Sequence, residues 1–347
     1  MEKIRIGIIG MGRMGITHFP IINSHPQVEV VSVSDTSKLI LDYLAKYVDG
    51  LKVYTDYEKQ LDSDYLDGIV ICTPPTLHYK ICKKALQNNI SVFCEKPFTT
   101  SVEEAKELAE DFERAGLVNQ VGYVYRCWDS FVKAKEFLDD NLVGNILNFR
   151  IELLSSSIDK PQKGNGWRTK RENGGGATYE VGSHIIDLTN YIFGKPDRIS
   201  GSSLINLNSQ VVDDIVHSTF HYKNGLVGQM YVNWCDLTYR KPMIKLAVFG
   251  DKGKLMVDSY ALKFFLNEDR KGYEKGWHHM NSTDLSKPVP FYVRGNAFTI
   301  QLYRFVDRIL DRNVSCPCSF SDGYEAQEVI HEIFNDSKTV AGDGSNS

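Results

Sequence analysis

The chain has 347 residues, which is enough for about two domains and excludes a single small disulfide-stapled module. Its composition is 42% hydrophobic and 24% charged, which excludes a disordered or fibrous protein. The 40 Lys and Arg residues against 44 Asp and Glu residues give a net charge of −4, so nothing attracts the chain generally to nucleic acid or to an anionic membrane.

The cysteines and the start of the chain indicate its compartment. Seven cysteines are scattered without the paired spacing of a metal site, and the neighbours Cys316/Cys318 and His278/His279 lie in irregular regions without further ligands. The chain begins with charged residues and a glycine, and no run approaches the roughly eighteen apolar residues of a membrane span. We therefore expect a cytoplasmic protein with no metal site and no membrane segment, and we expect both neighbouring pairs to be surface features.

Short strands alternate with helical patterns from Ile4 to about Tyr123. Residues 6–9 and 69–71 are apolar without polar alternation, as in strands buried on both faces. This alternation predicts βαβ units, so residues 1–123 are expected to form a doubly wound parallel sheet. The expected strands and helices cover 4–10, 14–24, 28–33, 39–47, 68–72, 78–88, 91–94, 102–115 and 118–121.

The rhythm of the chain changes in the second half. Longer runs of alternating polarity, separated by turn signals such as Asn224-Gly225, predict an open-faced, mostly antiparallel sheet with helices on one side. We expect this second domain to cover residues 124–340 and residues 341–347 to form a frayed tail. The expected helices are 130–140, 178–193, 296–311 and 322–334, and the expected strands are 146–153, 216–222, 225–234, 244–250 and 254–258.

The first motif with chemical meaning is Gly10-Met11-Gly12-Arg13-Met14-Gly15. It leaves a buried strand and opens a helix, and Asp35 follows at the end of the next strand, which is the full context of a dinucleotide site. Gly10 permits the tight turn, Gly12 lets the backbone approach a pyrophosphate, and Gly15 lets helix and strand pack closely. The carboxylate of Asp35 suits the ribose hydroxyls of NAD and would repel the 2′-phosphate of NADP. NAD is therefore the expected cofactor, while Thr36, Ser37 and Lys38 leave NADP open.

Two further segments end parallel strands, where ligands of such sheets lie. Glu95-Lys96-Pro97 follows one strand, and Pro97 restricts Lys96 to an extended backbone and makes a cis bond easier. Lys96 either points into the crevice or pairs with Glu95 on its rim. The second segment contains Thr73, Pro74 and His78; the prolines stiffen it, and His78 either contacts a ligand or caps a helix. We assign Thr73, Pro74, His78, Glu95 and Lys96 to the cofactor side.

The third motif is the glycine triplet 174–176 followed by a helix from Thr178. Glu180, His184 and Asp187 stand at i, i+4 and i+7, on one face of the expected helix. The triplet would let another molecule approach the backbone, and Glu180 one turn from His184 can orient the ring and raise its pKa. The pair is either a general acid/base or an ordinary surface pair.

These three motifs, in this order and at these separations, resemble the glucose-fructose oxidoreductase / inositol dehydrogenase (Gfo/Idh/MocA) family over essentially the whole chain. The resemblance implies a Rossmann domain followed by a substrate-binding and oligomerisation domain. It implies an NAD(P)-dependent dehydrogenase acting on a CH–OH group of a sugar, cyclitol or nucleotide-sugar. A homodimer or homotetramer formed through the C-terminal sheet is also implied.

The resemblance also assigns roles to residues. Lys96 would hydrogen-bond the reacting hydroxyl, and His184 would accept its proton. Glu180 stands where the family usually has aspartate, and Asp187 matches a position that often contacts substrate hydroxyls. Trp167 and Arg168 match positions that reach the nicotinamide side of the cleft.

The proposed chemistry has a simple physical basis. Loss of hydride leaves positive character on the carbon, so a lysine must stabilise the developing alkoxide while a neutral histidine takes the proton, and the nicotinamide accepts the hydride. Two alternatives stay open: a keto-sugar reductase of a deoxysugar pathway, and a non-catalytic NAD-dependent sensor of the same fold.

The substrate itself is less well defined. Residues 159–172 contain five basic and two acidic residues, and this stretch either binds a phosphate, carboxylate or nucleotide diphosphate or is simply a solvated loop. Tyr123, Tyr125 and Arg126 follow the last parallel strand and are expected to line the same cleft, with Tyr125 and Arg126 as substrate residues. The tyrosines either stack on a sugar face or pack in the core.

Overall fold

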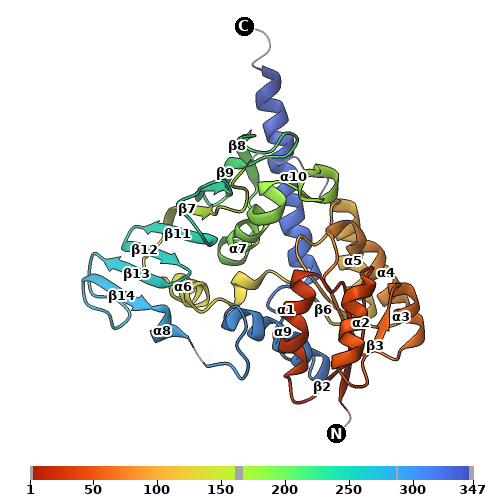
Figure 1. Ribbon diagram of the computed structural model, residues 1–347. Coiled ribbons are helices and arrows are strands. Elements are labelled where there is room, and N and C mark those ends of the chain that lie inside the picture. Colours follow the sequence, from red (N-terminus) through yellow and green to blue (C-terminus); the bar gives the residue numbers. More distant parts are fainter. Residues whose placement is uncertain (1–2, 161–166, 287, 344–347) are drawn as a thin grey trace. The chain divides into compact units, whose positions relative to one another are not determined.

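The computed structural model describes residues 3–160, 167–286 and 288–343. The chain divides into two compact units (Figure 1). The first comprises Met1–Cys127 and Pro288–Tyr324, and the second comprises Trp128–Lys287 and Glu325–Ser347.

The first unit contains a six-stranded parallel sheet in the order β3-β2-β1-β4-β5-β6. The doubly wound sheet expected from the sequence is confirmed. Its strands are β1 (Ile4–Ile9), β2 (Val28–Ser34), β3 (Lys52–Tyr54), β4 (Gly68–Ile71), β5 (Ser91–Cys94) and β6 (Asn119–Val121). Its helices are α1 (Arg13–Asn23), α2 (Lys38–Tyr47), α3 (Tyr57–Ser63), α4 (His78–Gln87), α5 (Val102–Ala115) and α9 (Asn296–Leu310), with short turns η1 (Pro75–Leu77) and η2 (Val124–Cys127). The sequence did not predict β3 and α3, which are too short to show a clear period.

The segment that includes α9 belongs to the first unit, although it follows the second sheet in sequence. Leu302, Phe305 and Val306 of α9 are fully buried in the same core as Ile6 and Phe93 of the parallel sheet. The sequence suggested a single boundary near Tyr123. The structure instead returns the chain to the first unit, because the apolar face of α9 is buried against α1 and β5.

The second unit contains an eight-stranded sheet in the order β14-β13-β12-β11-β7-β10-β9-β8, antiparallel except for the pair β7 and β10. The expected mostly antiparallel sheet is confirmed. Its strands are β7 (Ile146–Leu154), β8 (Arg198–Ile205), β9 (Ile215–His221), β10 (Val227–Asn233), β11 (Met243–Gly250), β12 (Gly253–Asp258), β13 (Ala261–Leu266) and β14 (Gly276–Asn281). The sequence did not predict β8, β13 and β14; His278 and His279 lie in β14, so their expected place in an irregular region is wrong.

Helices cover one face of this sheet: α6 packs on β12 and β13, and α7 packs on β7. The helical elements of the second unit are α6 (Asp129–Asp139), η3 (Trp167–Thr169), η4 (Arg171–Asn173), η5 (Thr178–Gly182), α7 (Ser183–Phe193) and α8 (Ser282–Leu285). The last helix, α10 (Phe320–Asp343), begins in the first unit and continues into the second. Residues 341–343 therefore extend a helix rather than the tail we expected, and residues 344–347 lie outside the described residues. Within the described part of the chain, no helix is both long enough and apolar enough to span a membrane.

Candidate active site

The glycine-rich loop joins β1 to α1 in the geometry that its sequence predicts. Gly10 has a φ of +90°, which favours glycine, and its N–H donates to the carbonyl of Ser34 at 2.8 Å. A Cβ at Gly15 would lie 2.0 Å from the carbonyl oxygen of Gly10, so only glycine fits there. A Cβ at Gly12 would meet nothing within 4 Å. The loop is thus closed where helix meets strand and open at Gly12, where a ligand would approach.

The open side of this loop suits an anion. Gly12 is the N-cap of α1, and the first turn of the helix has no acidic residue and no side-chain cap. Helix geometry leaves the first backbone N–H groups without partners inside the helix, and the helix dipole adds partial positive charge. Arg13 is exposed and Met14 is half-buried at this end. Met11, by contrast, has its side chain buried in the core, so it does not face a ligand.

Asp35 is fixed beside the same loop. Its Oδ2 accepts the Met11 N–H at 2.6 Å, and its Oδ1 accepts the Ser37 N–H at 2.7 Å. Asp35 is half-buried, and each carboxylate oxygen keeps a second lone pair for another donor. The carboxylate therefore both holds the loop and remains able to accept a hydrogen bond from a ribose hydroxyl.

Thr73 and His78 lie at the end of β4, the neighbour of β1. The Thr73 hydroxyl is buried, and it has no hydrogen-bond partner among the residues that the structure describes. A bound nucleotide could satisfy such a hydroxyl, and Pro74 next to it is exposed. His78, in contrast, is fully buried, and its ring lies between the carbonyl of Thr73 at 2.9 Å and those of Pro97 and Phe98 at 3.0 and 3.1 Å.

His78 therefore joins two loops of the sheet edge and does not face a ligand, which corrects its assignment to the cofactor side. Burial lowers the pKa of His78, although hydrogen bonding to the three carbonyls opposes this effect.

The Glu95-Lys96-Pro97 segment lies at the end of β5, the next strand along. The Lys96–Pro97 peptide bond is cis, and Lys96 is half-buried. Because β1, β4 and β5 are adjacent parallel strands, their carboxyl ends bring the glycine-rich loop, Thr73 and Lys96 to one edge of one sheet.

Glu95 is buried beneath this edge, and its partner is His18 of α1, a residue that sequence analysis did not identify. Glu95 Oε1 lies 2.6 Å from His18 Nε2, and Glu95 Oε2 accepts the Lys96 N–H at 3.2 Å. Burial alone would raise the pKa of Glu95, but the hydrogen bond to His18 and the charges of His18 and Lys96 hold it below its ordinary value. Glu95 thus holds the backbone of Lys96 by a hydrogen bond and has its side chain buried against His18 instead of facing a cofactor. No local pattern links His18 to Glu95, because the two residues are 77 positions apart in the chain.

The glycine triplet packs against the protein's own chain. A Cβ at Gly175 would lie 2.3 Å from the carbonyl oxygen of Arg168, and a Cβ at Gly176 would lie 2.6 Å from Asp213 Oδ1. Our expectation that the triplet admits another molecule is therefore corrected: these two glycines make room for Arg168 and Asp213.

Asp213 is the second functional residue that sequence analysis missed. It is fully buried, and its Oδ2 accepts both the N–H and the hydroxyl of Thr178, at 2.7 and 2.6 Å. Its main-chain carbonyl accepts the Ala177 N–H at 2.7 Å. Burial raises the pKa of Asp213, although the hydrogen bonds from Thr178 oppose this effect. Asp213 thus fixes the start of the helical segment that carries Glu180 and His184.

That segment is not a single regular helix. Residues Thr178–Gly182 form a π-helical turn, and α7 begins only at Ser183. Glu180 and His184 are half-buried, whereas Asp187 is fully buried. Asp187 is thus more deeply buried than Glu180 and His184, and its role as a substrate contact stays a prediction. Because a π-helical turn is wider than an α-helical turn, the side chain of Glu180 is rotated about the helix axis relative to its direction in a regular α-helix.

The basic stretch 159–172 is partly neutralised. Arg168 donates to Glu180 Oε1 at 3.2 Å, and Arg171 lies 3.9 Å from Asp213 Oδ1 with its guanidinium over the ring of Phe334. Trp167 begins η3, and its side chain and residues 161–166 lie outside the described residues. Arg168 thus contacts Glu180, a candidate catalytic residue.

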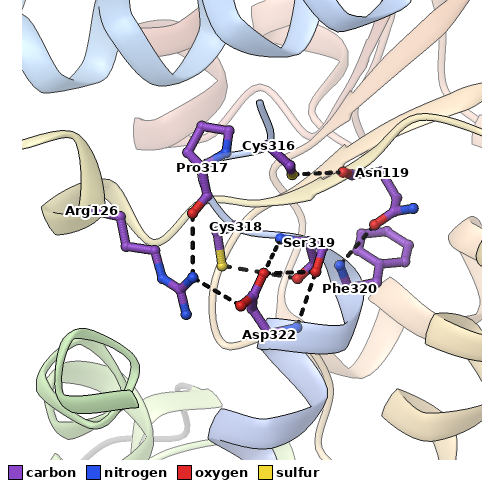
Figure 2. A network of polar contacts seen from close by, with 8 residues as sticks. All are labelled: Asn119, Arg126, Cys316, Pro317, Cys318, Ser319, Phe320 and Asp322. Atoms are coloured by element: carbon purple, nitrogen blue, oxygen red, sulfur yellow. Dashed lines mark hydrogen bonds and ion pairs between the residues drawn. The ribbon is translucent and has the colours of Figure 1, made fainter. Parts of the chain in front are cut away.

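Arg126 is buried and already paired (Figure 2). Its Nη1 donates to Asp322 Oδ1 at 2.9 Å and to the Pro317 carbonyl at 3.3 Å, while Asp322 Oδ2 accepts the N–H and the hydroxyl of Ser319. Its side chain is 5% exposed. The arginine anchors the segment before α10, which corrects its assignment as a substrate residue. The neighbouring Tyr125 is half-buried and stays a candidate.

The two cysteines of this segment are part of the same network. Cys316 donates to the carbonyl of Asn119 at 3.6 Å, and Cys318 is only 1% exposed. The expectation that both are surface features is wrong for Cys318, because it packs beneath the start of α10.

Both units match described protein families. Residues 4–123 match "Oxidoreductase family, NAD-binding Rossmann fold", and residues 131–256 match "GFO/IDH/MocA C-terminal domain".

Several curated proteins are similar in sequence. Glucose-6-phosphate 3-dehydrogenase of Bacillus subtilis is 25% identical over 352 residues, which cover 95% of each chain. The scyllo-inositol 2-dehydrogenase (NADP(+)) of the same organism is 26% identical over 226 residues, 64% of this chain and 61% of that protein. Two uncharacterized oxidoreductases of Schizosaccharomyces pombe are 29% and 30% identical over 230 residues, and the match spans only 61% of their length.

Solved structures share the fold over nearly the whole chain. Levoglucosan dehydrogenase in complex with NADH and levoglucosan gives a TM-score of 0.87 at 21% identity, with 97% of this chain and 98% of that chain covered. The WlbA dehydrogenase from Bordetella pertussis in complex with NADH and UDP-GlcNAcA gives 0.79 at 19% identity, with 97% of each chain covered.

Proposed function

The chain belongs to the GFO/IDH/MocA family of oxidoreductases, its first unit is an NAD-binding Rossmann domain, and from this premise we propose that it is a sugar dehydrogenase. It moves a hydride between the nicotinamide and a secondary hydroxyl, or the corresponding ketone, of a sugar, cyclitol or nucleotide-sugar. The observation that carries this proposal is the shared sheet edge, where adjacent strands present the open glycine-rich loop and Lys96 together.

The residues of the first unit fit the cofactor. The open position at Gly12, the helix end without an acidic residue, the Thr73 hydroxyl and the carboxylate of Asp35 are all groups that a dinucleotide would engage. Asp35 favours NAD over NADP, because its carboxylate would repel a 2′-phosphate.

The chemical step needs two protein groups at the reacting oxygen. Lys96 Nζ donates a hydrogen bond to this oxygen and stabilises negative charge on it, and His184 takes the hydroxyl proton during oxidation or returns it during reduction. Glu180 orients the ring of His184, and its pairing with Arg168 restrains the carboxylate. When bound, the nicotinamide supplies the hydride acceptor or donor.

The substrate class rests on the relatives. The relatives include a glucose-6-phosphate 3-dehydrogenase and an inositol dehydrogenase. The similar solved structures include complexes with levoglucosan and with UDP-GlcNAcA. These cover phosphorylated, free and nucleotide-linked sugars, all with secondary hydroxyls. Arg168 and Tyr125 are candidates for contacts that distinguish them.

A substrate panel tests the proposal. Polyols, free sugars, sugar phosphates and UDP-sugars would be mixed with NAD⁺, and the matching keto-sugars with NADH, while NADH absorbance is followed. We expect turnover with at least one class, in either direction. Tight NADH binding without any turnover, together with capture of a protein partner, would instead support the non-catalytic sensor.

We also propose that the protein forms a homo-oligomer through the uncovered face of the second sheet. Cross-strand pairing aligns Trp277, Phe265, Phe249 and Val227 in one row across this face, with Lys254 and Asn148 between them. Trp277 is 62% exposed and Phe249 48% exposed. Such a row favours association with a second apolar surface.

We propose the reducing cytoplasm as the compartment of the protein, and the seven free thiols agree with this proposal.

A further inference from the structure

Arg294 lies at the glycine-rich loop although it is 280 residues from it in sequence. Its Nη1 lies 3.6 Å from the Met14 Sδ, in the first turn of α1. Both residues belong to the first unit, because the segment 288–324 returns to that unit after the second sheet. Helix α9, which starts two residues after Arg294, packs against α1 (Figure 1).

The Arg294 residue is solvent-exposed and has little negative charge close to it. Across the described residues it forms no ion pair, and its guanidinium lies over the ring of Phe298, 5.4 Å from the centroid. Burial and the nearby positive charge of Arg13 lower the pKa of Arg294, while Glu95 and Tyr125 raise it. Glu95, however, is already hydrogen-bonded to His18. Arg13 and Arg294 therefore lie near each other and near the positive end of a helix, and the carboxylate of Glu95 offsets their charge only in part.

The backbone at Arg294 is unusual as well. Its φ is +63°, in the left-handed region that residues with a Cβ rarely adopt, and Gly295 follows with a φ of +120°. The conformation places a long cationic side chain against Met14 where a glycine would fit the backbone better.

We propose that Arg294, together with Arg13, binds the pyrophosphate of the dinucleotide cofactor. A guanidinium forms strong paired hydrogen bonds with phosphate oxygens, and the amino end of α1 is where the pyrophosphate of a Rossmann domain lies. The negative pyrophosphate would relieve the repulsion between the two arginines. The proposal depends on cofactor binding by the first unit and not on the sugar chemistry proposed above.

Binding of cofactor fragments to Arg294→Gly tests this role. The glycine removes the guanidinium and suits the positive φ, so the variant should melt at or above the temperature of the wild type. ADP-ribose, which contains the pyrophosphate but no nicotinamide, should bind about tenfold more weakly, as expected for one lost charge-assisted hydrogen bond. Adenosine, measured by competition with NADH fluorescence, should bind within about twofold of its wild-type affinity.

Two further variants make the test specific. Arg294→Lys keeps the charge and should recover part of the ADP-ribose affinity, whereas Arg114→Gln on α5 removes an exposed arginine, 73% accessible, and should change nothing. Unchanged ADP-ribose affinity in Arg294→Gly would overturn the proposal, and so would equal weakening of adenosine and ADP-ribose. If only the KM of a phosphorylated or nucleotide-linked sugar rises, the guanidinium serves the substrate and the proposal is also wrong.

Discussion

His18 and Glu95 form a hydrogen bond of 2.6 Å in the interior of the first unit, and Glu95 also accepts the backbone N–H of Lys96. The histidine side chain is 0% and the glutamate side chain 8% exposed, so water cannot replace either partner. A buried carboxylate without a partner is strongly destabilising. The pair therefore keeps a negative charge in place beside the backbone of Lys96.

Removing the His18 side chain should destabilise the folded protein, because it leaves the buried charge of Glu95 without its partner. We expect His18→Ala to lower the free energy of unfolding at pH 7 by about 3 kcal/mol, because Glu95 loses its partner inside the protein. Adding Glu95→Gln should restore part of the stability, because the neutral amide is easier to bury. Urea unfolding of both single variants and the double variant measures the coupling. If the double variant is as unstable as the sum of the two singles, the pair does not act as described.

Lys96 and His184 should separate chemistry from binding. We expect Lys96→Ala and His184→Ala each to lower kcat by about a hundredfold to a thousandfold, because alkoxide stabilisation or proton transfer is lost. Their NADH dissociation constants should stay within about threefold of the wild type. Fluorescence titration and steady-state kinetics with the substrate found in the panel provide both values. Near-normal turnover of either variant would contradict its assigned role.

Asp35 should decide the choice of cofactor. We expect the wild type to bind NADH at least about tenfold more tightly than NADPH, because the carboxylate repels the 2′-phosphate. Asp35→Ala should reduce that ratio, although it also frees the N–H groups of Met11 and Ser37 and so weakens both cofactors. Titration with each cofactor gives the ratio, and tighter NADPH binding by the wild type would refute the prediction.

The neighbours Asp213 and Asp214 should respond to pH in opposite ways. Burial raises the pKa of Asp213. Burial also opposes ionisation of Asp214, but hydrogen bonds from Ser209, Trp234 and Leu207 outweigh it and lower the pKa of Asp214. The folded protein therefore binds a proton at Asp213 more readily, and at Asp214 less readily, than the unfolded chain.

The sign of each effect follows from this difference. As the pH falls from 7, protonation of Asp213 increases the free energy of unfolding of the wild type. Asparagine cannot take up this proton. The stability of Asp213→Asn relative to the wild type should therefore fall while the pH is still above the ordinary pKa of about 3.8. Asp214→Asn should be less stable than the wild type at pH 7, with a deficit that shrinks only as the pH falls below about 3.8. Thermal unfolding across this range measures both differences. Parallel pH profiles for the two variants would show that the environments are not opposed.

The uncovered face of the second sheet should control self-association. We expect Phe249→Lys to raise the dissociation constant of the oligomer at least about tenfold, because a charge replaces an exposed aromatic ring in the centre of the row. Leu39→Lys, at an 81% exposed position of α2 in the first unit, is the matched control and should leave assembly unchanged. Sedimentation at several concentrations distinguishes the two. Equal effects would place the interface elsewhere.

Local rules were sufficient for much of the first unit. The conformation at Gly10, the close packing at Gly15 and the position of Asp35 depend on residues within one βαβ unit, so their order along the chain already predicts their geometry. The same holds for Lys96, because a residue at the end of a parallel strand must lie at the ligand edge of the sheet. The alternating polarity of the second half likewise predicts a sheet with one covered face.

Other features depend on partners that sequence spacing does not reveal. His18 meets Glu95 across 77 residues, and Arg126 meets Asp322 across 196, because burial brings their segments together. An arginine or a histidine near the end of a parallel strand can contact either a ligand or a buried partner of the protein, and its position in the sequence does not distinguish the two. Arg126 and His78 were for this reason assigned to ligands that they do not face.

The sequence by itself determined the two fold classes, the dinucleotide loop and the place of Lys96 at the end of a parallel strand, because each is encoded by a local pattern with a physical meaning. Only the tertiary structure decided that α9 belongs to the first unit, that Asp213 occupies the space beside Gly176, and that Arg294 lies against Met14. These relationships arise when apolar faces distant in sequence are buried together, and the polar side chains carried with them take whatever partners that packing provides.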